Sequence, residues 1–376
     1  MLKAEDDFMV QRRHIPRLQR SAFCIRIGMW CRKEQKEMYP VKRMAILLLS
    51  VLLLAACAGK TKENVFIRID RDDPNAWREE LANVRFLQEE RMSGSAQFSE
   101  TQFRDLADQL KDQAEEVWIV DCRLESHGLM NGMAVSWCGK GDNGANLGKT
   151  VEEVEAEEES FSSLIGSNIT AYTAEKDLPE DPLEMTVEKW ETERELVENE
   201  DMRYLRLACP DHCWPPCEVI DAFIDFAGRV EEEAWLHFHC QAGSGRTGAF
   251  MTIYEMMHKP EASVEEILRH QAETGSGNLA DRAAPEKSHE QKERCVLARA
   301  VYQYIRENRE SGYAVKWSSW LEEHSHIVEM QVGESLGGEG FSSDPLVVTD
   351  SLEAAAAGRA TVLAGEDIYF ITVNDK

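Results

Sequence analysis

The sequence has little positive charge for its length. Its 376 residues include 42 lysines and arginines against 69 aspartates and glutamates, which gives a formal net charge of −27. Nucleic acids and anionic membrane surfaces attract proteins mainly through basic residues, so this balance argues against both as charge-driven partners. The acidic residues are concentrated in Val151–Ser160 and Glu191–Asp201, and we expect these two runs to be solvated surfaces.

The chain also lacks internal repeats and a disulfide scaffold, because ten cysteines are too few for one at this length. Cys209, Cys213 and Cys217 are evenly spaced in a proline-stiffened loop, but their spacing fits no familiar zinc pattern. We interpret them as small residues of a tight loop, with a metal site or a redox clamp as alternatives. No metal and no cofactor is expected.

An apolar run long enough to span a bilayer comfortably is missing as well. The apolar run Met44–Cys57 is short, follows Lys42 and Arg43, and ends in Leu-Ala-Ala-Cys, which resembles a bacterial lipobox. This pattern predicts an exported protein that is anchored in the bacterial cell envelope through a lipid on Cys57, and an ordinary buried helix is the alternative. Residues 1–37 have no place in such a leader, so we expect the true start at Met38 or Met44.

Strand-like and helix-like segments alternate along the chain. Buried strands are predicted at Val117–Cys122, Tyr204–Leu207 and Trp235–Phe238. Helices are predicted after Ser99 and Ser263, which open capping boxes, after Cys217, and over about 290–308. The alternation indicates an α/β fold with a mainly parallel central sheet flanked by helices.

The remaining segments set the expected domain limits. Residues 1–57 form an N-terminal extension with the signal, 58–325 the main domain, and 326–376 a C-terminal extension. The irregular, acidic stretch of roughly 128–201 is interpreted as a small inserted lobe. The last residues are rich in Gly and Ala, and we expect either an appended tail or a small β unit.

The most informative stretch is His239-Cys-Gln-Ala-Gly-Ser-Gly-Arg-Thr247. It follows the predicted strand Trp235–Phe238 and precedes a helical stripe made by Phe250, Ile253, Tyr254 and Met257. A loop that leads into a helix directs its backbone N–H groups at one point, where the helix dipole favours negative charge. The pattern therefore predicts an anion-binding loop.

The residues of this loop suit phosphoryl transfer. Arg246 offers two parallel donors to phosphate oxygens, and Cys240 lies where the same field favours a nucleophilic thiolate. The residues between them form the predicted phosphate-binding loop: Gln241, Ala242, Gly243, Ser244 and Gly245. The spacing of Cys and Arg alone can arise by chance, and a buried Cys is usually inert. The strand–loop–helix context favours a covalent cysteinyl-phosphate mechanism.

A general acid is needed as well, because an alkoxide is a poor leaving group. Asp211 lies in the proline-stiffened loop before the helix that follows Cys217. From the residues alone, a turn-forming role for Asp211 has equal weight. Neighbouring His212 is either a surface residue or a phosphate donor. His239 is expected to hold the loop rather than to transfer protons.

At this point the chain resembles a known family, the protein-tyrosine-phosphatase-like inositol polyphosphatases, or bacterial cysteine phytases. The resemblance covers roughly residues 65 to 325. The matching stretches are Ser93–Phe98, Val120–Gly132, Val135–Trp137, Asn146–Lys149, Asp211–His212, His237–Thr247 and Trp317–Leu321. The Cys loop is common to all cysteine phosphatases, whereas the Arg-x-Glu-Ser-His-Gly segment within Val120–Gly132 is more particular to the phytases.

The resemblance implies a tyrosine-phosphatase-like core with a small β-barrel-like lobe, which acts on inositol polyphosphates without metal. It implies that Cys240 is the nucleophile, Asp211 the general acid and Arg246 the phosphate binder, and that Thr247 assists the departure of Cys240. Positions near the family's substrate pocket are matched by Asp121, His212, Arg85 and Lys149. Other functions on the same core are a protein-tyrosine or phosphoinositide phosphatase and a non-catalytic phosphate-binding module.

Three departures from the family pattern bear on the substrate. Gln241 stands where the family usually has Glu, which removes a negative charge beside the anion-binding loop. The segment between Arg85 and Ser93 is shorter than usual. The family's lysine-rich stretch is reduced to Ala280–Ser288, where Arg282 and Lys287 are the cations. We include Lys287 among the substrate contacts and expect weaker binding of phytate than in a lysine-rich relative.

Overall fold

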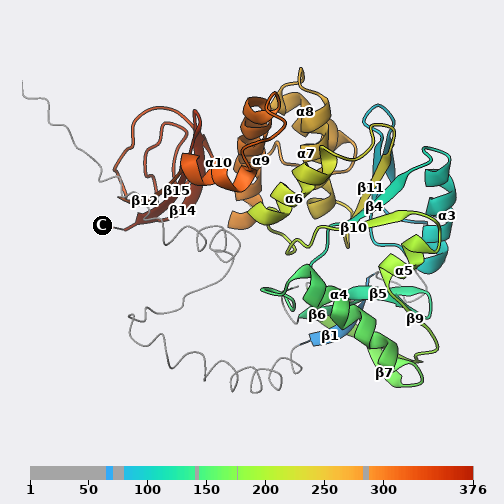
Figure 1. Ribbon diagram of the computed structural model, residues 1–376. Helices are drawn as coiled ribbons and strands as arrows, with labels where there is room; N and C mark the ends of the chain where they lie inside the picture. The colour runs from blue at the N-terminus through green and yellow to red at the C-terminus, as the bar shows by residue number, and fades with distance from the viewer. Residues whose placement is uncertain (1–64, 71–79, 140–143, 176, 283–287, 376) are drawn as a thin grey trace, which may run out of the picture. The chain divides into compact units, whose positions relative to one another are not determined.

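The computed structural model describes residues 65–70, 80–139, 144–175, 177–282 and 288–375 (Figure 1). The predictions for the signal segment, Cys57 and Lys287 lie outside these residues. The described chain divides into two compact units, which we treat separately. The first unit comprises residues 65–211 and 231–247, and the second comprises 212–230 and 248–375.

A five-stranded sheet forms the centre of the first unit. Its strand order is β10-β4-β11-β3-β2, with bounds Arg203–Arg206, Val117–Asp121, Trp235–His239, Met92–Ser95 and Arg85–Leu87. The first four strands pair in parallel and β2 pairs antiparallel with β3, so the sheet is mixed. The strands predicted near residues 117, 204 and 235 are all present.

Helix α3, Glu100–Lys111, covers part of this sheet because its buried residues recur at helical spacing. Ser99 accepts a hydrogen bond from the backbone of Gln102, whose side chain accepts one from Ser99 in return, so the predicted capping box is confirmed. Phe103, Leu106 and Leu110 are buried in one hydrophobic cluster with residues of the sheet strands. Burial of one helical face against a sheet is the usual source of helix stability.

A second, six-stranded sheet corrects the expectation for the lobe. Its order is β8-β7-β1-β6-β5-β9, with bounds Leu178–Thr186, Asn168–Glu175, Val65–Ile69, Met133–Gly139, His127–Met130 and Trp190–Glu191. No pairing between the described edge strands β8 and β9 closes this sheet, so the expected barrel-like form is not found. Strand β9 has two residues, which is too short to complete a barrel wall.

The acidic runs do not lie wholly on the surface, as the sequence had suggested. They form helices α4, Val151–Ser160, and α5, Glu193–Glu198, each preceded by a capping threonine. Most of their carboxylates are exposed or partly exposed, but Glu158 and Glu193 are only 5% and 2% exposed. The expectation was wrong for these two residues because arginine and histidine side chains from other segments reach them.

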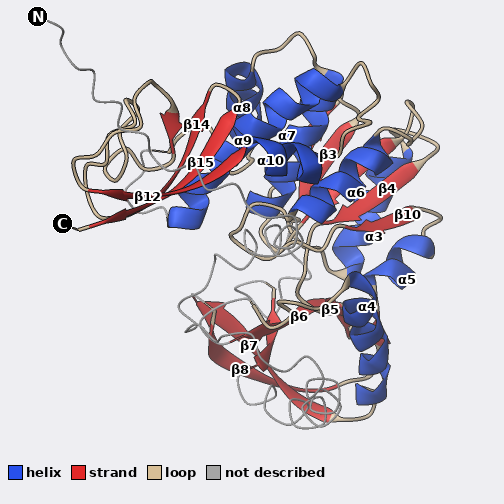
Figure 2. Cartoon of the chain, turned by 60° about the vertical axis from the view of Figure 1, so that its left-hand side comes forward, coloured by secondary structure: helices blue, strands red, loops and turns tan. Residues whose placement is uncertain are grey.

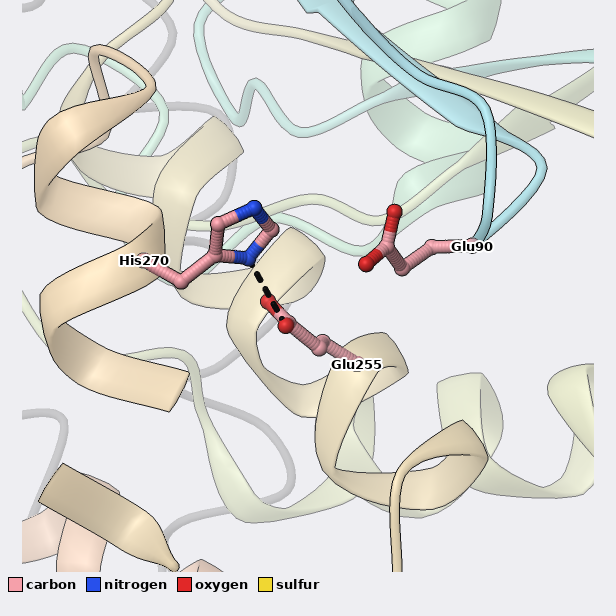
Figure 3. Close-up of side chains that lie close together, drawn as sticks. All are labelled: Glu90, Glu255 and His270. Carbon is pink, nitrogen blue, oxygen red and sulfur yellow. Dashed lines mark hydrogen bonds and ion pairs between the residues drawn. The ribbon is translucent and has the colours of Figure 1, made fainter. Parts of the chain in front are cut away.

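The second unit contains five described helices and a small sheet (Figure 2). The helices are α6 Cys217–Ala227, α7 Gly245–His258, α8 Val264–Glu273, α9 His289–Asn308 and α10 Trp317–His324. Helix α7 starts at the end of the first unit and continues into the second. Helices α7 and α8 are linked by Glu255, whose carboxylate lies 2.8 Å from His270 Nδ1 (Figure 3).

The end of the chain is a small β unit, one of the two alternatives left by the sequence. Its four strands are ordered β12-β15-β14-β13, with bounds Ser325–Gln331, Asp367–Asn374, Gly358–Ala364 and Phe341–Ser342. It has its own hydrophobic cluster, which includes Val348, Val362 and Ile371. Among all described helices, none is both long enough and apolar enough to cross a bilayer.

Candidate active site

The His239–Thr247 loop lies at the carboxyl end of β11, between two parallel neighbours. His239 is in register with Asp121 of β4 and with Ser95 of β3. Helix α7 begins at Gly245, so Arg246 and Thr247 lie in its first turn. The strand–loop–helix arrangement predicted from the sequence is therefore confirmed, and it places a helix N-terminus at the loop.

Three successive carbonyl groups of the loop are held from the outside. The donors are Gln97 N–H to the Gln241 carbonyl (3.2 Å), Asn83 Nδ2 to Ala242 (2.7 Å) and Arg85 Nη1 to Gly243 (2.9 Å). In a trans peptide the N–H group points opposite to the carbonyl. The amide groups that follow these carbonyls therefore turn to the inner side of the loop, where they form an anion-binding concavity.

Gly243 is required at its position for two reasons. Its φ is +71°, in the left-handed region that residues with a side chain rarely adopt. A Cβ atom there would lie 2.4 Å from Ala96 N and from the Ser95 carbonyl carbon, both of which are backbone atoms. The loop thus packs directly on the end of β3, which fixes its curvature.

Arg246 is anchored by a buried carboxylate, Glu125, whose segment resembled the phytases but to which the sequence analysis assigned no role. Its Nη1 and Nη2 atoms bind Glu125 Oε2 and Oε1 at 2.6 and 2.9 Å, in a two-pronged pair. Burial opposes the charge of Arg246, but Asp211 and Glu125 outweigh it and hold the Arg246 pKa well above its usual value. The guanidinium is therefore charged and fixed in direction.

Two polar side-chain atoms in the first turn of α7 remain available to a ligand. Arg246 Nε and Thr247 Oγ1 are buried and have no hydrogen-bond partner among the described residues. A buried donor without a partner is unfavourable by about 1–3 kcal/mol, so such atoms are unusual in a finished structure. A tetrahedral oxyanion in the concavity of the loop would supply the missing acceptors.

Glu125 belongs to a buried row of alternating charges. Arg123 Nε lies 2.9 Å from Glu125, Arg123 Nη1 lies 2.9 Å from Asp70, and Arg68 Nε lies 3.1 Å from Asp70. Burial disfavours the ionised form of Glu125, yet Arg246 and Arg123 outweigh it and keep the Glu125 pKa well below its usual value. The signals in the sequence were that Arg123 and Glu125 directly follow a buried strand and belong to the phytase-like Arg-x-Glu-Ser-His-Gly segment.

Asp211 lies next to this group. Its side chain is 22% exposed and its Oδ1 atom is 3.4 Å from Arg246 Nη2. The backbone carbonyl of Cys209 accepts a further hydrogen bond from Arg246 at 3.2 Å, which holds the Asp211 loop near the Cys240 loop. The structure thus brings together the predicted nucleophile loop, phosphate binder and general acid within the first unit.

The remaining predicted substrate contacts lie in different settings. Asp121 is fully buried and accepts hydrogen bonds from Tyr204 Oη (2.7 Å) and Arg123 N (2.9 Å). Arg85 is buried against the Gly243 carbonyl, and burial lowers its pKa to about 10, although the neighbouring Cys240 opposes the shift. These contacts make Asp121 part of the interior and Arg85 a support of the loop.

Lys149 and His212 are more accessible. Lys149 Nζ lies 2.7 Å from Glu157 Oε2 and 2.7 Å from Asn146 Oδ1, and its side chain is 33% exposed. His212 is exposed, has a φ of +62°, and belongs to the second unit. The local contacts of Lys149 offset part of its charge, so any attraction it exerts on a polyanion is reduced.

A cysteine at the head of an anion-binding loop, a fixed arginine within it and a nearby acid are typical of cysteine-dependent phosphatases. A family model for PTP-like phytases, described by the words inositol hexakisphosphate, matches residues 120–258. These residues include the predicted nucleophile, acid and arginine.

Known structures and sequences agree with this class. A tandemly repeated PTP-like phytase from Mitsuokella multacida is 33% identical, with a TM-score of 0.63 over 69% of this chain and 49% of that one. A PTP-like myo-inositol phosphatase from the same organism, solved with myo-inositol-(1,3,4,5)-tetrakisphosphate, is 34% identical with the same TM-score and coverage. A PTP-like phytase from Bdellovibrio bacteriovorus is 28% identical, with a TM-score of 0.58 over 68% of this chain and 94% of that one.

Among curated proteins, effector protein hopD2 of Pseudomonas syringae pv. tomato is 25% identical over 217 residues, which is 54% of this chain and 45% of that protein. The chain thus spans about half the length of this relative and of the Mitsuokella chains. The chain is similar to the protein-tyrosine-phosphatase-like phytases in its sequence and its fold, and the resemblance stated from its sequence is confirmed.

Proposed function

We propose that this protein is a metal-independent phosphomonoesterase that removes phosphates from myo-inositol polyphosphates through a cysteinyl-phosphate intermediate. One observation carries the proposal above all others. Arg246 Nε and Thr247 Oγ1 are buried at the Cys240 loop without partners among the described residues, beside amide groups turned inward. The inositol tetrakisphosphate bound by the Mitsuokella protein supports the substrate class.

The proposed first step is an in-line displacement at phosphorus. The Cys240 thiolate forms the S–P bond while the P–O bond to the inositol oxygen breaks, and Asp211 donates a proton to that leaving oxygen. Arg246 and the amide groups of the loop stabilise the charge on the three remaining phosphate oxygens. Glu125 contributes indirectly because it fixes the direction of the guanidinium.

The second step returns the enzyme to its starting state. Water attacks the phosphorus of the cysteinyl phosphate, Asp211 as the carboxylate accepts the water proton, and the S–P bond breaks to release inorganic phosphate and the Cys240 thiolate. The Thr247 hydroxyl donates to the departing sulfur, which is the role implied by the family resemblance. Besides the substrate, the two steps use Cys240, Asp211, Arg246, Thr247, the amide groups of the loop and water.

Substrate class is tested by measuring phosphate release from phytate and from a phosphotyrosine peptide with the same purified protein. We expect phytate to be the better substrate, and we expect EDTA to leave its hydrolysis unchanged. A much faster reaction with the peptide would instead support the protein-phosphatase function. Loss of activity with EDTA that a divalent ion restores would contradict the metal-free mechanism.

We also propose that the protein is exported and anchored by a lipid on Cys57. The basic pair before the apolar run and the Leu-Ala-Ala-Cys57 ending support this proposal. The mature protein should begin at Cys57 and partition with membranes, and Cys57→Ala should release it without changing its chemistry. A mature chain that retains Met1, or a wholly soluble protein with unmodified Cys57, would contradict it.

A further inference from the structure

Gln97, in the segment between β3 and α3, is a buried amide to which the phosphatase mechanism assigns no role. Its side chain and backbone together are only 2% exposed. Its backbone N–H donates to the Gln241 carbonyl of the nucleophile loop at 3.2 Å. Its side-chain Oε1 accepts from Arg123 Nη1 at 2.6 Å, and its Nε2 donates to Glu193 Oε2 at 2.7 Å. One residue therefore contacts the loop and two separate groups of buried charges.

The first group of charges leads from Gln97 to Arg246. Arg123 binds Glu125 Oε1 through Nε and Asp70 Oδ2 through Nη1, both at 2.9 Å. Glu125 in turn holds Arg246 with both of its oxygens, and its Oε1 atom accepts from the two arginines at once. The direction of the Arg246 guanidinium therefore depends on how Arg123 is held, and Gln97 is one of the three side chains that hold it.

The second group of charges is centred on Glu193 of α5. Its Oε1 atom lies 2.7 Å from His239 Nε2, and its Oε2 atom lies 3.1 Å from His127 Nε2. Burial favours the neutral form of Glu193, but His239 and His127 outweigh burial and hold its pKa well below the usual value. Glu193 is therefore ionised, and it can only accept the hydrogen bond from Gln97.

The two partners of the Gln97 side chain specify an amide. A guanidinium such as Arg123 can only donate, and the ionised Glu193 can only accept. The side chain between them must therefore present an acceptor at one end and a donor at the other, which a neutral amide does. Because each end has one possible partner, the Gln97 amide has a single orientation in this network.

Gln97 thus bears on both kinds of donor that face the predicted phosphate. In a trans peptide the Ala242 N–H points opposite to the Gln241 carbonyl, so the bond from Gln97 turns that N–H to the inner side of the loop. The side chain of Gln97 acts on Arg246 through the row of charges that begins at Arg123. Donors stabilise an oxyanion best when their positions are fixed before it binds.

We propose that Gln97 is a positioning residue, which sets the spacing between the loop amides and the Arg246 guanidinium and so the affinity of the loop for a tetrahedral oxyanion. The proposal deepens the proposed function and rests on it in one respect, that the loop binds phosphate. Gln97 acts through Gln241 and Arg123, without contact with the reacting atoms.

The test is the affinity of the full chain for tungstate, a tetrahedral oxyanion that is not turned over, measured by calorimetry from pH 5 to pH 8. Gln97→Glu keeps the acceptor for Arg123 but places a second carboxylate against Glu193. Two carboxylates in such contact resist joint ionisation, so one takes up a proton as the pH falls, and this proton restores the lost donor. Tungstate binding should therefore be about ten-fold weaker at pH 8 and should approach that of the unaltered protein at pH 5.

Other charged and titratable groups face this pair of positions or their partners from several segments. They are Asp70 after β1, Asp121 of β4, Arg123 after β4, His127 of β5, Glu158 of α4, Tyr204 and Arg206 of β10, and His237 and His239 of β11. All of them are present in both proteins. The ratio of the two affinities at each pH therefore isolates the effect of the substitution.

Gln102→Glu is the matched control. Gln102 is also buried, at 5% exposure, and its side-chain oxygen accepts from Ser99 N at 3.0 Å in the capping box of α3. Glutamate serves equally well at this position of a capping box, so tungstate affinity should equal that of the unaltered protein at each pH. Unweakened binding by folded Gln97→Glu at pH 8, or the same weakening at pH 5 and pH 8, would overturn the proposal.

A second variant covers the case in which Gln97→Glu fails to fold. Gln97→Met removes both polar ends without adding charge, so it should weaken tungstate binding by a similar factor at every pH, and unweakened binding would overturn the proposal. Should neither variant fold, NMR can follow exchange of the Gln97 side-chain amide protons in the unaltered protein. Exchange should slow when tungstate binds, and an unchanged rate would overturn the proposal.

Tungstate binding does not depend on turnover, so it separates this inference from the proposed function. Weakened, pH-dependent binding by Gln97→Glu, in a protein that releases no phosphate from phytate, would refute the inositol phosphatase function and leave the role of Gln97 intact. Turnover of phytate by the unaltered protein, with unweakened tungstate binding by the variant, would do the reverse.

Discussion

The nucleophile loop and the buried ion clusters behind it are both polar, but they are assembled in opposite ways. The loop consists of consecutive residues from Cys240 to Thr247, and its curvature follows from one glycine and three tethered carbonyls. The clusters draw on β1, on the segment after β4, and on α4, α5 and β10. The loop is a local structure, whereas the clusters form only when the first unit folds.

This difference has consequences for what each region can tolerate. A change in the loop alters the chemistry at phosphorus directly. A change in a cluster leaves a buried partner without its opposite charge, which typically destabilises a protein by about 3–5 kcal/mol. Residues of the clusters should therefore affect stability most, whereas residues of the loop should affect turnover most.

The largest effect is expected from Cys240→Ser. Serine lacks the thiolate, so turnover of phytate should fall by about 10⁴-fold or more, while the fold and the binding of phosphorylated ligands remain. Cys295→Ser is the control, because Cys295 is a buried thiol of α9 that the mechanism does not use. Steady-state phosphate release from both variants gives the comparison, and appreciable turnover by Cys240→Ser would contradict a covalent mechanism.

Gly243→Ala should produce the next largest loss, because it breaks the local structure of the loop. Its control is Gly166→Ala, since Gly166 also has a positive φ, +87°, but a Cβ added there would meet no atom within 4 Å. The left-handed conformation alone disfavours alanine by about 1–2 kcal/mol. Denaturant unfolding should show a loss of stability in both variants, and the loss should be larger in Gly243→Ala. Turnover should be lost in Gly243→Ala alone. Equal effects would show that contact with β3 is unimportant.

Asp211→Asn should cause a smaller loss that depends on the substrate. Release of an inositol oxygen needs a proton, so turnover of phytate should fall by about 10²-fold or more. An aryl phosphate with a good phenolic leaving group needs the proton less and should lose about ten-fold at most. Parallel kcat measurements on the two substrates make the comparison, and equal losses would give Asp211 a structural role.

The sequence predicted the loop well because the determinants of the loop are consecutive. Strand β11, helix α7 and the capping box of α3 could likewise be predicted from local patterns. The clusters could not, because Glu158 and Glu193 lie in runs of acid that normally face water. Nothing near Glu158 in the sequence indicates that Arg206, 48 residues later, binds both of its oxygens.

A small lobe was predicted, but its strand pairing could not be, for a related reason. Strand β8 is mostly exposed and has an irregular pattern, and β1 pairs with β6 and β7 from distant parts of the sequence. Hydrophobic periodicity reflects the burial of side chains along one segment, so it predicts poorly a strand at the edge of a sheet. Two residues that the resemblance placed near the substrate have other surroundings in the structure. Asp121 is buried in the interior, and Arg85 binds the backbone of the loop.

The smallest effect is expected at Glu293, a buried carboxyl of the second unit that lacks the arginine partners of Glu125. Burial raises the Glu293 pKa to about 7, although Thr361, which donates to it at 2.7 Å, opposes the shift. A raised pKa in the folded state favours the protonated form, so this contribution is full below about pH 4.5 and is lost as pH rises through about 7.

Glu293→Gln should remove that pH dependence and stabilise the protein above pH 7 by about 3 kcal/mol. The free energy of unfolding, measured in denaturant from pH 4.5 to 8, gives the comparison with the unaltered protein. Glu307→Gln is the control, because Glu307 lies on the same helix, is exposed, and is not among the charges that shift the Glu293 pKa. If the free energy of unfolding of Glu293→Gln depended on pH as strongly as that of the unaltered protein, Glu293 would not be the source of that dependence.

The most direct measurement is a rapid acid quench of the protein during hydrolysis of phytate, followed by mass spectrometry of the Cys240 peptide. If Cys240 forms the proposed S–P bond, that peptide should carry one phosphoryl group during turnover. Phosphate release from phytate with no phosphorylated Cys240 under any quench time, together with full activity of Cys240→Ser, would contradict the mechanism.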